Sequence, residues 1–284
     1  MITVTLTTDW GTDGLYGGAF KGKLVQRIPG VQLIDITHTV PPLNPIYAVY
    51  ALQNAYTFFA KKTIHIVGVG GIIGSNTDTS KREYICFQHN HHYFIGPNNG
   101  MWEMMFGEIP SDVFLLDAQQ LSEQFIAFPE LDIYIDAVAK LALGNEPKHL
   151  GPKTQCNLGR LVALPARKEN HLLGVFQYFD VYGNGITNIT KQEFYDTAKG
   201  RKFEIMVGTE RHEFVVDFIA HDYSEGDSSK ILALFSYTGF LEICVPFSKL
   251  TNFLHIDKNT KILVHFFDED EAENQQNEYK ETLF

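Results

Sequence analysis

Short β-branched runs alternate with amphipathic helical stretches over the first half of the chain, and this alternation restricts the fold more than any other feature. The order is strand 2–7, helix 15–27, strand 31–36, helix 46–59 and strand 63–69. Strands that alternate with helices of this spacing build a sheet covered by helices. A strand at 113–116 and a helix at 132–143, closed by Gly144 and Pro147, continue the pattern. We therefore predict an α/β domain.

The second half has a different pattern, in which strand-length runs are separated by polar or glycine-bearing turns. These runs lie at 161–164, 174–179, 202–207, 213–218, 231–235, 241–245 and 262–266, and one short helix is expected near 191–198. Many short strands at regular spacing predict an all-β barrel or sandwich. We expect an α/β domain at 1–155 and a β-barrel domain at 156–267. The polar segment 268–284 is expected to be a frayed acidic tail.

The charge of the chain argues against a nucleic-acid-binding function. The net charge is −11, from 23 basic and 34 acidic residues, and the last seventeen residues alone contribute −6. Nucleic-acid phosphates are held by clustered Lys and Arg, which an acidic body without a basic stripe does not offer. The same charge is compatible with a cationic small molecule.

The cysteines and the apolar segments indicate the compartment. Cys86, Cys156 and Cys244 are odd in number and far apart, so they do not form a disulfide framework or a metal knuckle. No signal peptide is recognisable, and no window reaches the roughly 18 apolar residues of a membrane helix. We expect a cytoplasmic protein without a membrane span.

The sequence matches two ligand-binding motifs only in part, one for a dinucleotide and one for calcium. A glycine-bearing segment follows the strand at 63–69, but residues 75–80, rich in Ser and Thr, do not begin the helix that a dinucleotide site requires. The next strand ends in Gln88 instead of an acid that would hold a ribose. Residues 180–185 resemble a calcium loop, but Tyr182 occupies a position that requires a carboxylate. We predict neither NAD nor calcium.

A histidine cluster, His89, His91 and His92, has two interpretations. His89 and His91 would share one face of an extended segment and could chelate zinc. Such a run is also typical of the exposed tip of a hairpin, and the sequence identifies no third protein ligand close to it. No metal is predicted, and the role of the cluster stays open.

A polar segment at residues 7–13 marks the end of the first strand. In α/β sheets ligands bind beyond the carboxyl ends of the strands. A carboxylate such as Asp9 can accept two hydrogen bonds from a ribose diol and attract a cation. The alternative is that Asp9 or Asp13 caps the helix that begins near Leu15. Residue chemistry alone favours the helix cap.

Five segments, met in the same order along the chain, resemble the S-adenosyl-L-methionine hydroxide adenosyltransferase and fluorinase/chlorinase family. They are Thr7–Gly22, Ile34–Pro42, Phe94–Gly100, Asp180–Asn188 and Gly239–Ile243. The resemblance implies an α/β domain and a β-barrel domain in a homotrimer. It also implies that S-adenosylmethionine lies between the first domain of one subunit and the second domain of a neighbour, where water or a halide displaces methionine from C5′.

The resemblance also assigns candidate substrate-binding residues. In the first domain, Asp9 matches the carboxylate that holds the ribose hydroxyls, and Trp10 is expected to contact the same ligand. In the second domain, Asp180 matches the acid near the methionine ammonium. Tyr182 matches an aromatic neighbour of the ligand, and Asn184 matches the amide that reads adenine.

The reaction centre departs from the family pattern. Water-using members carry an Asp, an Arg and a His around the attacking oxygen. Gly70 stands at the position of the Asp and Pro129 at that of the His. Arg82, or alternatively Lys81, is the candidate for the Arg.

Two further positions bear on the reaction. Halogenating members have a Ser at the position of Glu130, and a carboxylate repels a halide, so halogenase activity is not expected. Tyr237 stands where a Ser is expected in the block that clamps the methionine carboxylate. Tyr237 is therefore a substrate-binding candidate at an altered position.

Three functions remain for comparison. The first is an S-adenosylmethionine hydrolase that forms adenosine and needs no further cofactor, with Glu130 as the candidate base and Arg82 beside it. The second is a non-catalytic member that binds an adenosine-type nucleoside as a sensor or assembly element. The third is a hydrolase that uses Glu130 and Asp132 on another ligand.

Overall fold

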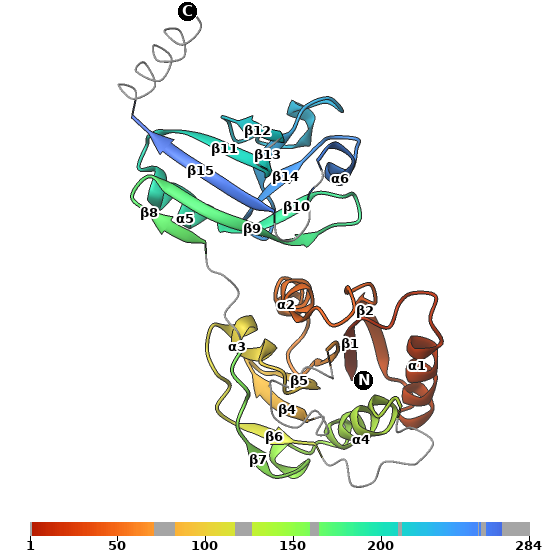
Figure 1. Ribbon diagram of the computed structural model, residues 1–284. Coiled ribbons are helices and arrows are strands. Elements are labelled where there is room, and N and C mark those ends of the chain that lie inside the picture. The colour runs from red at the N-terminus through yellow and green to blue at the C-terminus, as the bar shows by residue number, and fades with distance from the viewer. Residues whose placement is uncertain are drawn as a thin grey trace, which may run out of the picture. The chain divides into compact units, whose positions relative to one another are not determined.

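The computed structural model describes two compact units, Met1–Val162 and Ala163–Phe284 (Figure 1). The described residues are 2–70, 83–116, 127–159, 165–209, 212–254, 256 and 260–268. The first unit is a sheet with helices and the second is an antiparallel barrel-like sheet. The predicted fold class is confirmed.

The first unit contains a seven-stranded sheet in the order β2-β1-β3-β5-β4-β6-β7. Strands β1, β2, β3 and β5 are parallel, whereas β4, β6 and β7 pair antiparallel. The elements are β1 (Thr3–Thr8), α1 (Leu15–Arg27), β2 (Gln32–Thr37), α2 (Pro45–Gln53), η1 (Tyr56–Phe58), β3 (Ile64–Gly68), β4 (Tyr84–His89), β5 (His92–Pro97), α3 (Met101–Phe106), β6 (Val113–Leu115), α4 (Glu130–Ala142), η3 (Pro147–His149) and β7 (Lys153–Thr154).

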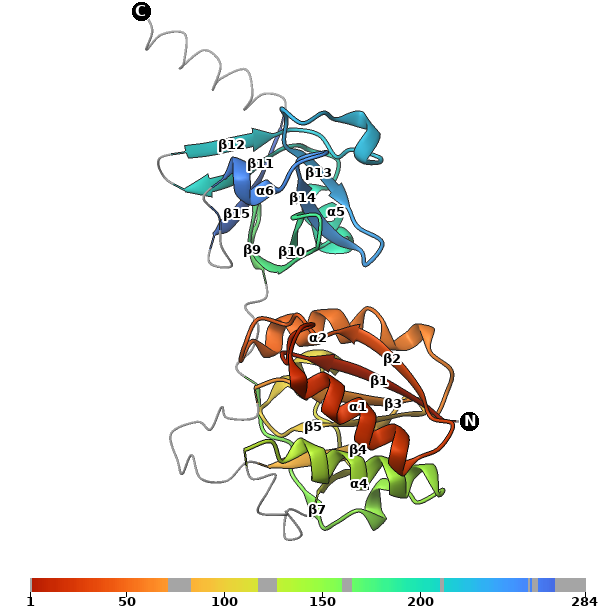
Figure 2. The same cartoon turned by 90° about the vertical axis from the view of Figure 1, so that its right-hand side faces the viewer.

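Helices cover both faces of this sheet because alternate side chains of its strands are apolar in both directions. Ile64 and Ile66 of β3 belong to the core that includes Phe20 of α1 and Val138 of α4. Val67, on the opposite face, belongs to the core formed with α2 and α3. Helices α1 and α4 lie side by side (Figure 2). The sheet is therefore the middle of three layers.

The second unit is an antiparallel sheet of eight strands in the order β12-β11-β15-β9-β10-β14-β13, with β8 paired to β9. One core, which includes Leu172, Ile205 and Ile262, fills its interior. The elements are β8 (Ala166–Lys168), β9 (His171–Phe179), β10 (Gly185–Thr190), α5 (Lys191–Ala198), β11 (Lys202–Thr209), β12 (His212–Val216), η4 (Tyr223–Glu225), β13 (Leu232–Phe235), β14 (Phe240–Cys244), α6 (Leu250–Phe253) and β15 (Lys261–Phe267).

Several elements differ from the sequence predictions, and strands β7, β8 and β10 and helix α6 were not predicted. The helix expected at 46–59 ends at Gln53, because Asn54 turns its side-chain amide back onto the Tyr50 carbonyl at 2.8 Å, and a 3₁₀ turn follows. Helix α4 begins at Glu130, two residues earlier than predicted. The six-residue helix α3 was not predicted. The strand expected at 161–164 lies outside the described residues.

The helices of the described ranges are short or interrupted by polar residues. None of them is long and apolar enough to cross a membrane.

Candidate functional site

The carboxyl ends of β1, β2 and β3 meet at one edge of the first unit, and backbone hydrogen bonds join the loops that follow β1 and β2. The amide of Gly11 donates to the His38 carbonyl at 2.8 Å, and the amide of Val40 donates to the Thr8 carbonyl at 3.3 Å. The amide of Asp9 donates to the Gly68 carbonyl at 3.2 Å, which adds the end of β3. This edge is where α/β sheets bind ligands.

Asp9 does not cap helix α1, so the helix-cap alternative is wrong. The N-cap of α1 is Gly14, and no side chain bonds to it. Instead, Asp9 Oδ2 accepts a hydrogen bond from the Leu43 amide at 3.1 Å, across the two loops. The backbone amides of Gly70 and of Asp9 itself also act on this carboxylate. Because a carboxylate offers about four lone-pair sites, Asp9 is a loop-held carboxylate that can accept further hydrogen bonds.

The environment of Asp9 acts on its pKa in two directions. Partial burial raises the pKa of the carboxyl group, and the backbone amides of Leu43, Asp9 itself and Gly70 lower it. Burial is the larger effect, so the net shift is upward. An opposite charge or hydroxyl donors brought by a ligand would reverse this shift.

Trp10 is held by aromatic packing beside this carboxylate. Its ring meets Phe128 edge-on at 5.0 Å and Phe20 at 5.1 Å, and it lies nearly parallel to His38 at 6.4 Å. The indole also lies against Gly68, where an added Cβ would come within 2.4 Å of Trp10 Cζ2. The indole is therefore immobilised at the end of β3, with part of its ring exposed.

Glu130 is the first residue of α4 and lies among tyrosines. Tyr84 donates its hydroxyl hydrogen to Glu130 Oε1 at 3.2 Å. The ring of Tyr84 meets that of fully buried Tyr134 edge-on at 5.3 Å. Burial raises the pKa of Tyr134, and the charges of Glu130, Tyr84 and Asp9 raise it further. The charges of Glu130 and Asp9 therefore act on the same phenol, although the two acids are distant in sequence.

The other positions of the expected reaction centre have different outcomes. Arg82 and Lys81 lie outside the described residues. Pro129 occupies the N-cap position of α4. Gly70 adopts a left-handed φ of 69°, and its carbonyl accepts a hydrogen bond from the Asn99 side-chain amide at 3.3 Å. Neither Gly70 nor Pro129 offers an acid–base group.

In the second unit, Asp180 and Asn184 form one hydrogen-bonded turn between β9 and β10. Asp180 Oδ1 accepts from the Asn184 backbone amide at 2.8 Å, and Oδ2 accepts from Asn184 Nδ2 at 3.1 Å. The bond from Asn184 Nδ2 to Asp180 fixes the orientation of the side-chain amide, whose oxygen is a hydrogen-bond acceptor. Asn184 is 8% exposed, whereas Tyr182 in the same turn is 75% exposed.

Tyr237 is 84% exposed and lies in the turn between β13 and β14. The strand pairing puts this turn at the opposite end of β14 from the Asp180–Asn184 turn, since Gly185 pairs with Ile243 and Thr190 with Phe240. A ligand that contacts both turns must therefore extend along β14.

One acid of the second unit escaped the sequence analysis. Glu242 is 3% exposed and accepts a hydrogen bond from the Tyr223 hydroxyl at 2.8 Å. Burial raises its pKa, and the charge of Asp180 adds to this effect. Its β10 partner, Ile186, lies two residues after Asn184. A lone acid within the apolar run of β14 was the available signal.

The histidine cluster does not converge on one point. His92 is buried, and its Nδ1 lies 3.1 Å from His65 Nε2. His91 is exposed at the β4–β5 turn with a left-handed φ of 66°. His89 Nδ1 lies 3.9 Å from a Glu108 carboxylate oxygen. Over the described ranges, no three His, Cys, Asp or Glu side chains gather as a metal site would require.

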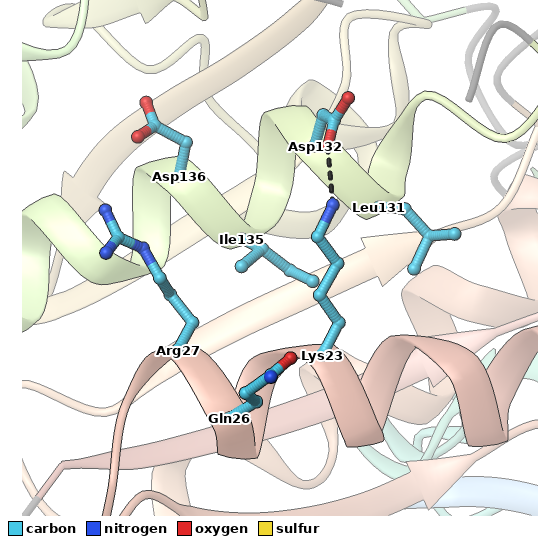
Figure 3. A pocket seen from close by; sticks show the side chains of 7 residues that line it. All are labelled: Lys23, Gln26, Arg27, Leu131, Asp132, Ile135 and Asp136. Carbon is cyan, nitrogen blue, oxygen red and sulfur yellow. Dashed lines mark hydrogen bonds and ion pairs between the residues drawn. The ribbon is translucent and has the colours of Figure 1, made fainter. Parts of the chain in front are cut away.

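A groove of about 270 Å³ runs along the seam between α1 and α4 (Figure 3). Lys23 bridges it to Asp132 at 2.6 Å. Because Asp132 points into this groove toward α1 and Glu130 bonds to β4, the two acids face different elements. The lining residues are Lys23, Gln26, Arg27, Leu131, Asp132, Ile135 and Asp136. The groove is a helix seam with its own ion pair, and it does not unite the two acids of the third function considered above.

Comparison with known proteins identifies the family to which this sequence is similar. Residues 4–151 match the SAM hydroxide adenosyltransferase N-terminal domain, and residues 174–263 match the C-terminal domain of the same family. The (R)-S-adenosyl-L-methionine hydrolase of Methanocaldococcus jannaschii is 25% identical over 267 residues, which cover 89% of this chain and 92% of the relative. The hydrolase of the same name from Thermus thermophilus is 27% identical over 203 residues, covering 67% and 76%.

Solved structures agree on the fold. An uncharacterized conserved protein from Thermotoga maritima superposes with a TM-score of 0.78 at 24% identity, covering 93% of this chain and all of that chain. A conserved hypothetical protein from Thermus thermophilus gives 0.67 at 22% identity, covering 94% and 100%. At these identities the likeness shows the fold. The family match extends over both units, and the chain belongs to the SAM hydroxide adenosyltransferase family.

Proposed function

We propose that this chain is an S-adenosyl-L-methionine hydrolase, in which water attacks C5′ in line with the sulfonium and releases adenosine and methionine. The observation that carries this proposal is the position of Asp9, whose carboxylate is held by the Leu43 amide at the carboxyl edge of the sheet. The relatives named (R)-S-adenosyl-L-methionine hydrolase support the same reaction.

The two units would hold different parts of the adenosyl group. The Asp9 carboxylate is suited to accept hydrogen bonds from the ribose diol, next to Trp10 in the sequence. The oxygen of the Asn184 amide, oriented by the bond from its nitrogen to Asp180, would accept from the exocyclic amino group of adenine. The carboxylate of Asp180 would also attract the positive ligand, and exposed Tyr182 offers a ring face to it. Tyr237 would contact the methionine end.

Displacement of methionine from the sulfonium requires little acid–base catalysis. Methionine leaves the sulfonium as a neutral thioether, so holding a water molecule in line at C5′ supplies much of the acceleration. Glu130 is the proposed base, since Tyr84 orients its carboxylate at the beginning of α4. Arg82 is proposed to act beside it. The reaction would then need no cofactor other than the substrate.

The proposed assembly is a homotrimer with each site shared by two subunits. The support is that the candidate ligand residues divide between the units, with Asp9 and Trp10 in one and Asp180, Tyr182 and Asn184 in the other. A cytoplasmic location is proposed as well, because Cys86, Cys156 and Cys244 are all unpaired and buried. Alternatively, the chain binds an adenosine-type nucleoside without turnover, which the loss of acid–base groups at Gly70 and Pro129 favours.

Incubation of the purified chain with S-adenosylmethionine, followed by chromatography for adenosine and methionine, tests the proposal. The wild type should form both products without dependence on chloride or fluoride. Glu130→Gln should lower kcat by about 10²- to 10⁴-fold if the carboxylate is the base. Asp9→Asn should mainly raise KM, because ribose binding contributes equally before and at the transition state.

Asp13→Asn is the matched control, since Asp13 is an exposed acid in the same loop. It should retain wild-type rates. Adenosine binding without any product would select the non-catalytic alternative, and absence of both binding and product would leave only the family and the fold. A halide-dependent product would overturn the interpretation of Glu130.

A further inference from the structure

A series of neighbouring polar side chains begins at Thr8, the residue before Asp9. Thr8 Oγ1 is 2.6 Å from His38 Nδ1. His38 Nε2 is 3.0 Å from Asp35 Oδ1, and Asp35 Oδ2 is 2.5 Å from Lys21 Nζ. Thr8 and His38 are buried, whereas Asp35 and Lys21 reach the surface. These four side chains thus lie in a row from the end of β1, through the end of β2, to helix α1.

The two ring nitrogens of His38 have different neighbours. His38 Nε2 lies beside the Asp35 carboxylate without a well-aligned hydrogen bond to it, whereas Nδ1 and the Thr8 hydroxyl share a hydrogen bond whose donor depends on the tautomer. The Thr8 oxygen in turn accepts the Trp10 amide at 3.4 Å. The Thr8 bond and the Asp35 carboxylate on the other side of the ring hold the imidazole in one orientation.

A hydroxyl, an imidazole and an acid in series resemble a nucleophilic triad, but access argues against that role. Thr8 is 0% exposed, and the Trp10 ring lies nearly parallel to the imidazole at 6.4 Å. A substrate carbon does not reach a hydroxyl enclosed in this way. These side chains therefore position other residues and do not form a covalent bond with a substrate.

What they position is the loop that holds Asp9. Two backbone hydrogen bonds join the same segments: the Gly11 amide donates to the His38 carbonyl, and the Val40 amide donates to the Thr8 carbonyl. The same loop ends at Leu43, whose left-handed φ of 60° directs its amide onto Asp9 Oδ2. A non-glycine residue adopts such a φ at a cost, and its surroundings must hold it there.

We propose that His38 is a positioning residue for ribose recognition: bonded to Thr8 and packed beside Asp35, it fixes the loop from His38 to Leu43 so that the Asp9 carboxylate faces the ribose diol. The inference rests on the proposed function, because it takes Asp9 as the ribose carboxylate. It assigns specificity for the diol to residues that do not touch the ligand.

The test compares the dissociation constants of adenosine and 2′,3′-dideoxyadenosine, measured by calorimetry on the full chain. The wild type should prefer adenosine by on the order of 10- to 100-fold, the range expected for hydrogen bonds to a charged acceptor. Thr8→Val, which removes the hydroxyl and keeps the shape, should lose most of this preference. Thr8→Ser retains the hydroxyl and should preserve it.

A double-mutant cycle separates positioning from a general loss of stability. In an Asp9→Asn background, Thr8→Val should cause no further loss of diol preference, because both changes act on one interaction. If Thr8→Val does not fold, Asp35→Ala replaces it, because Asp35 lies at the surface. Asp35→Ala should reduce the preference for adenosine over 2′,3′-dideoxyadenosine several-fold. Lys21→Met removes only the outer ion pair and should leave the preference intact.

The outcomes are distinguishable. If the wild type discriminates between the two nucleosides and Thr8→Val and Asp35→Ala discriminate equally well, the positioning role of His38 is overturned and the proposed function stands. If the wild type binds both nucleosides equally, the assignment of Asp9 fails and the positioning role fails with it.

Discussion

At the scale of single residues, two buried histidines show that surroundings decide what a side chain does. Thr5 Oγ1 lies 2.7 Å from His65 Nδ1, and His65 Nε2 lies 3.1 Å from His92 Nδ1. Burial lowers the pKa of His65 to about 3, with the neighbouring His92 adding to the effect. Burial also lowers the pKa of His92. Both rings are therefore neutral near pH 7.

This pair predicts a loss of stability in acid. The unfolded chain binds a proton on His65 near the ordinary value of 6.5, whereas the folded chain binds it only near 3. The contribution is thus complete above pH 6.5 and declines as the pH falls from 6.5 toward 3, by at most about 1.4 kcal/mol per pH unit. Urea unfolding at about pH 7.5, 6.0 and 5.0 measures how the free energy of unfolding changes with pH.

Variants assign that slope to the pair. His65→Gln should flatten the pH dependence of unfolding between pH 6.5 and 5, whatever its effect on absolute stability. His91→Gln is the control, because His91 is exposed at the turn. Equal slopes for wild type and His65→Gln would show that other groups cause the acid loss.

Gly68 is a second residue whose role depends on a neighbour distant in sequence. An added Cβ would lie 2.4 Å from Trp10 Cζ2 and 2.7 Å from Cε2, so Gly68→Ala should displace the indole and destabilise the fold by roughly 1–3 kcal/mol. Urea unfolding and tryptophan fluorescence measure both effects. Gly18→Ala meets nothing within 4 Å and should be neutral or stabilising. Unchanged fluorescence in Gly68→Ala would contradict the packing of Trp10.

At the scale of elements, helices α1 and α5 begin in different ways. Helix α5 has a reciprocal capping box, in which Thr190 Oγ1 accepts from the Glu193 amide at 3.1 Å and Glu193 Oε2 accepts from the Thr190 amide at 2.9 Å. Helix α1 has no side-chain cap. The difference leaves Asp9 available for the neighbouring loop, whereas the polar residues at α5 are used by the helix itself.

The capping box predicts a defined stability loss. Thr190→Ala should lower the free energy of unfolding by about 1 kcal/mol, because it leaves the Glu193 amide without its cap. Thr190→Ser keeps the hydroxyl and should remain within a few tenths of wild type. Thermal and urea unfolding of both variants check this, and equal destabilisation by Ala and Ser would exclude the cap as the cause.

At the scale of the whole molecule, the division of ligand residues between two units predicts complementation. The assembly should have three times the 32.2 kDa mass of the chain by light scattering. Asp9→Ala and Asn184→Ala chains, each impaired at low substrate concentration, should regain activity there when mixed and reassembled, because some shared sites then combine an intact first unit with an intact second unit. Asp9→Ala mixed with Glu130→Gln should show no such recovery, since both lie in the first unit.

The reverse pattern would contradict the shared site. A monomeric mass, or no recovery in the Asp9→Ala and Asn184→Ala mixture despite a trimeric mass, would place each site within one subunit.

Local signals in the sequence determined most of the architecture. The bounds of α1 and α5 were predicted as observed, because apolar period and helix ends are set by residues a few positions apart. Helix α3 was missed because its six residues, between left-handed Gly100 and Gly107, are too few to show a period. The strand-end rule also placed Asp9 at a ligand edge before the fold was known.

Only the tertiary structure decided what the side chains at that edge do. Residue chemistry favoured Asp9 as a helix cap, but its partner is Leu43, 34 positions away. Thr8 meets His38 across 30 positions, and Tyr84 meets Glu130 across 46. Periodicity and capping act within a few residues, whereas these contacts depend on which strands become neighbours. Strand order follows from packing of the whole sheet, so a pattern along the chain does not contain it.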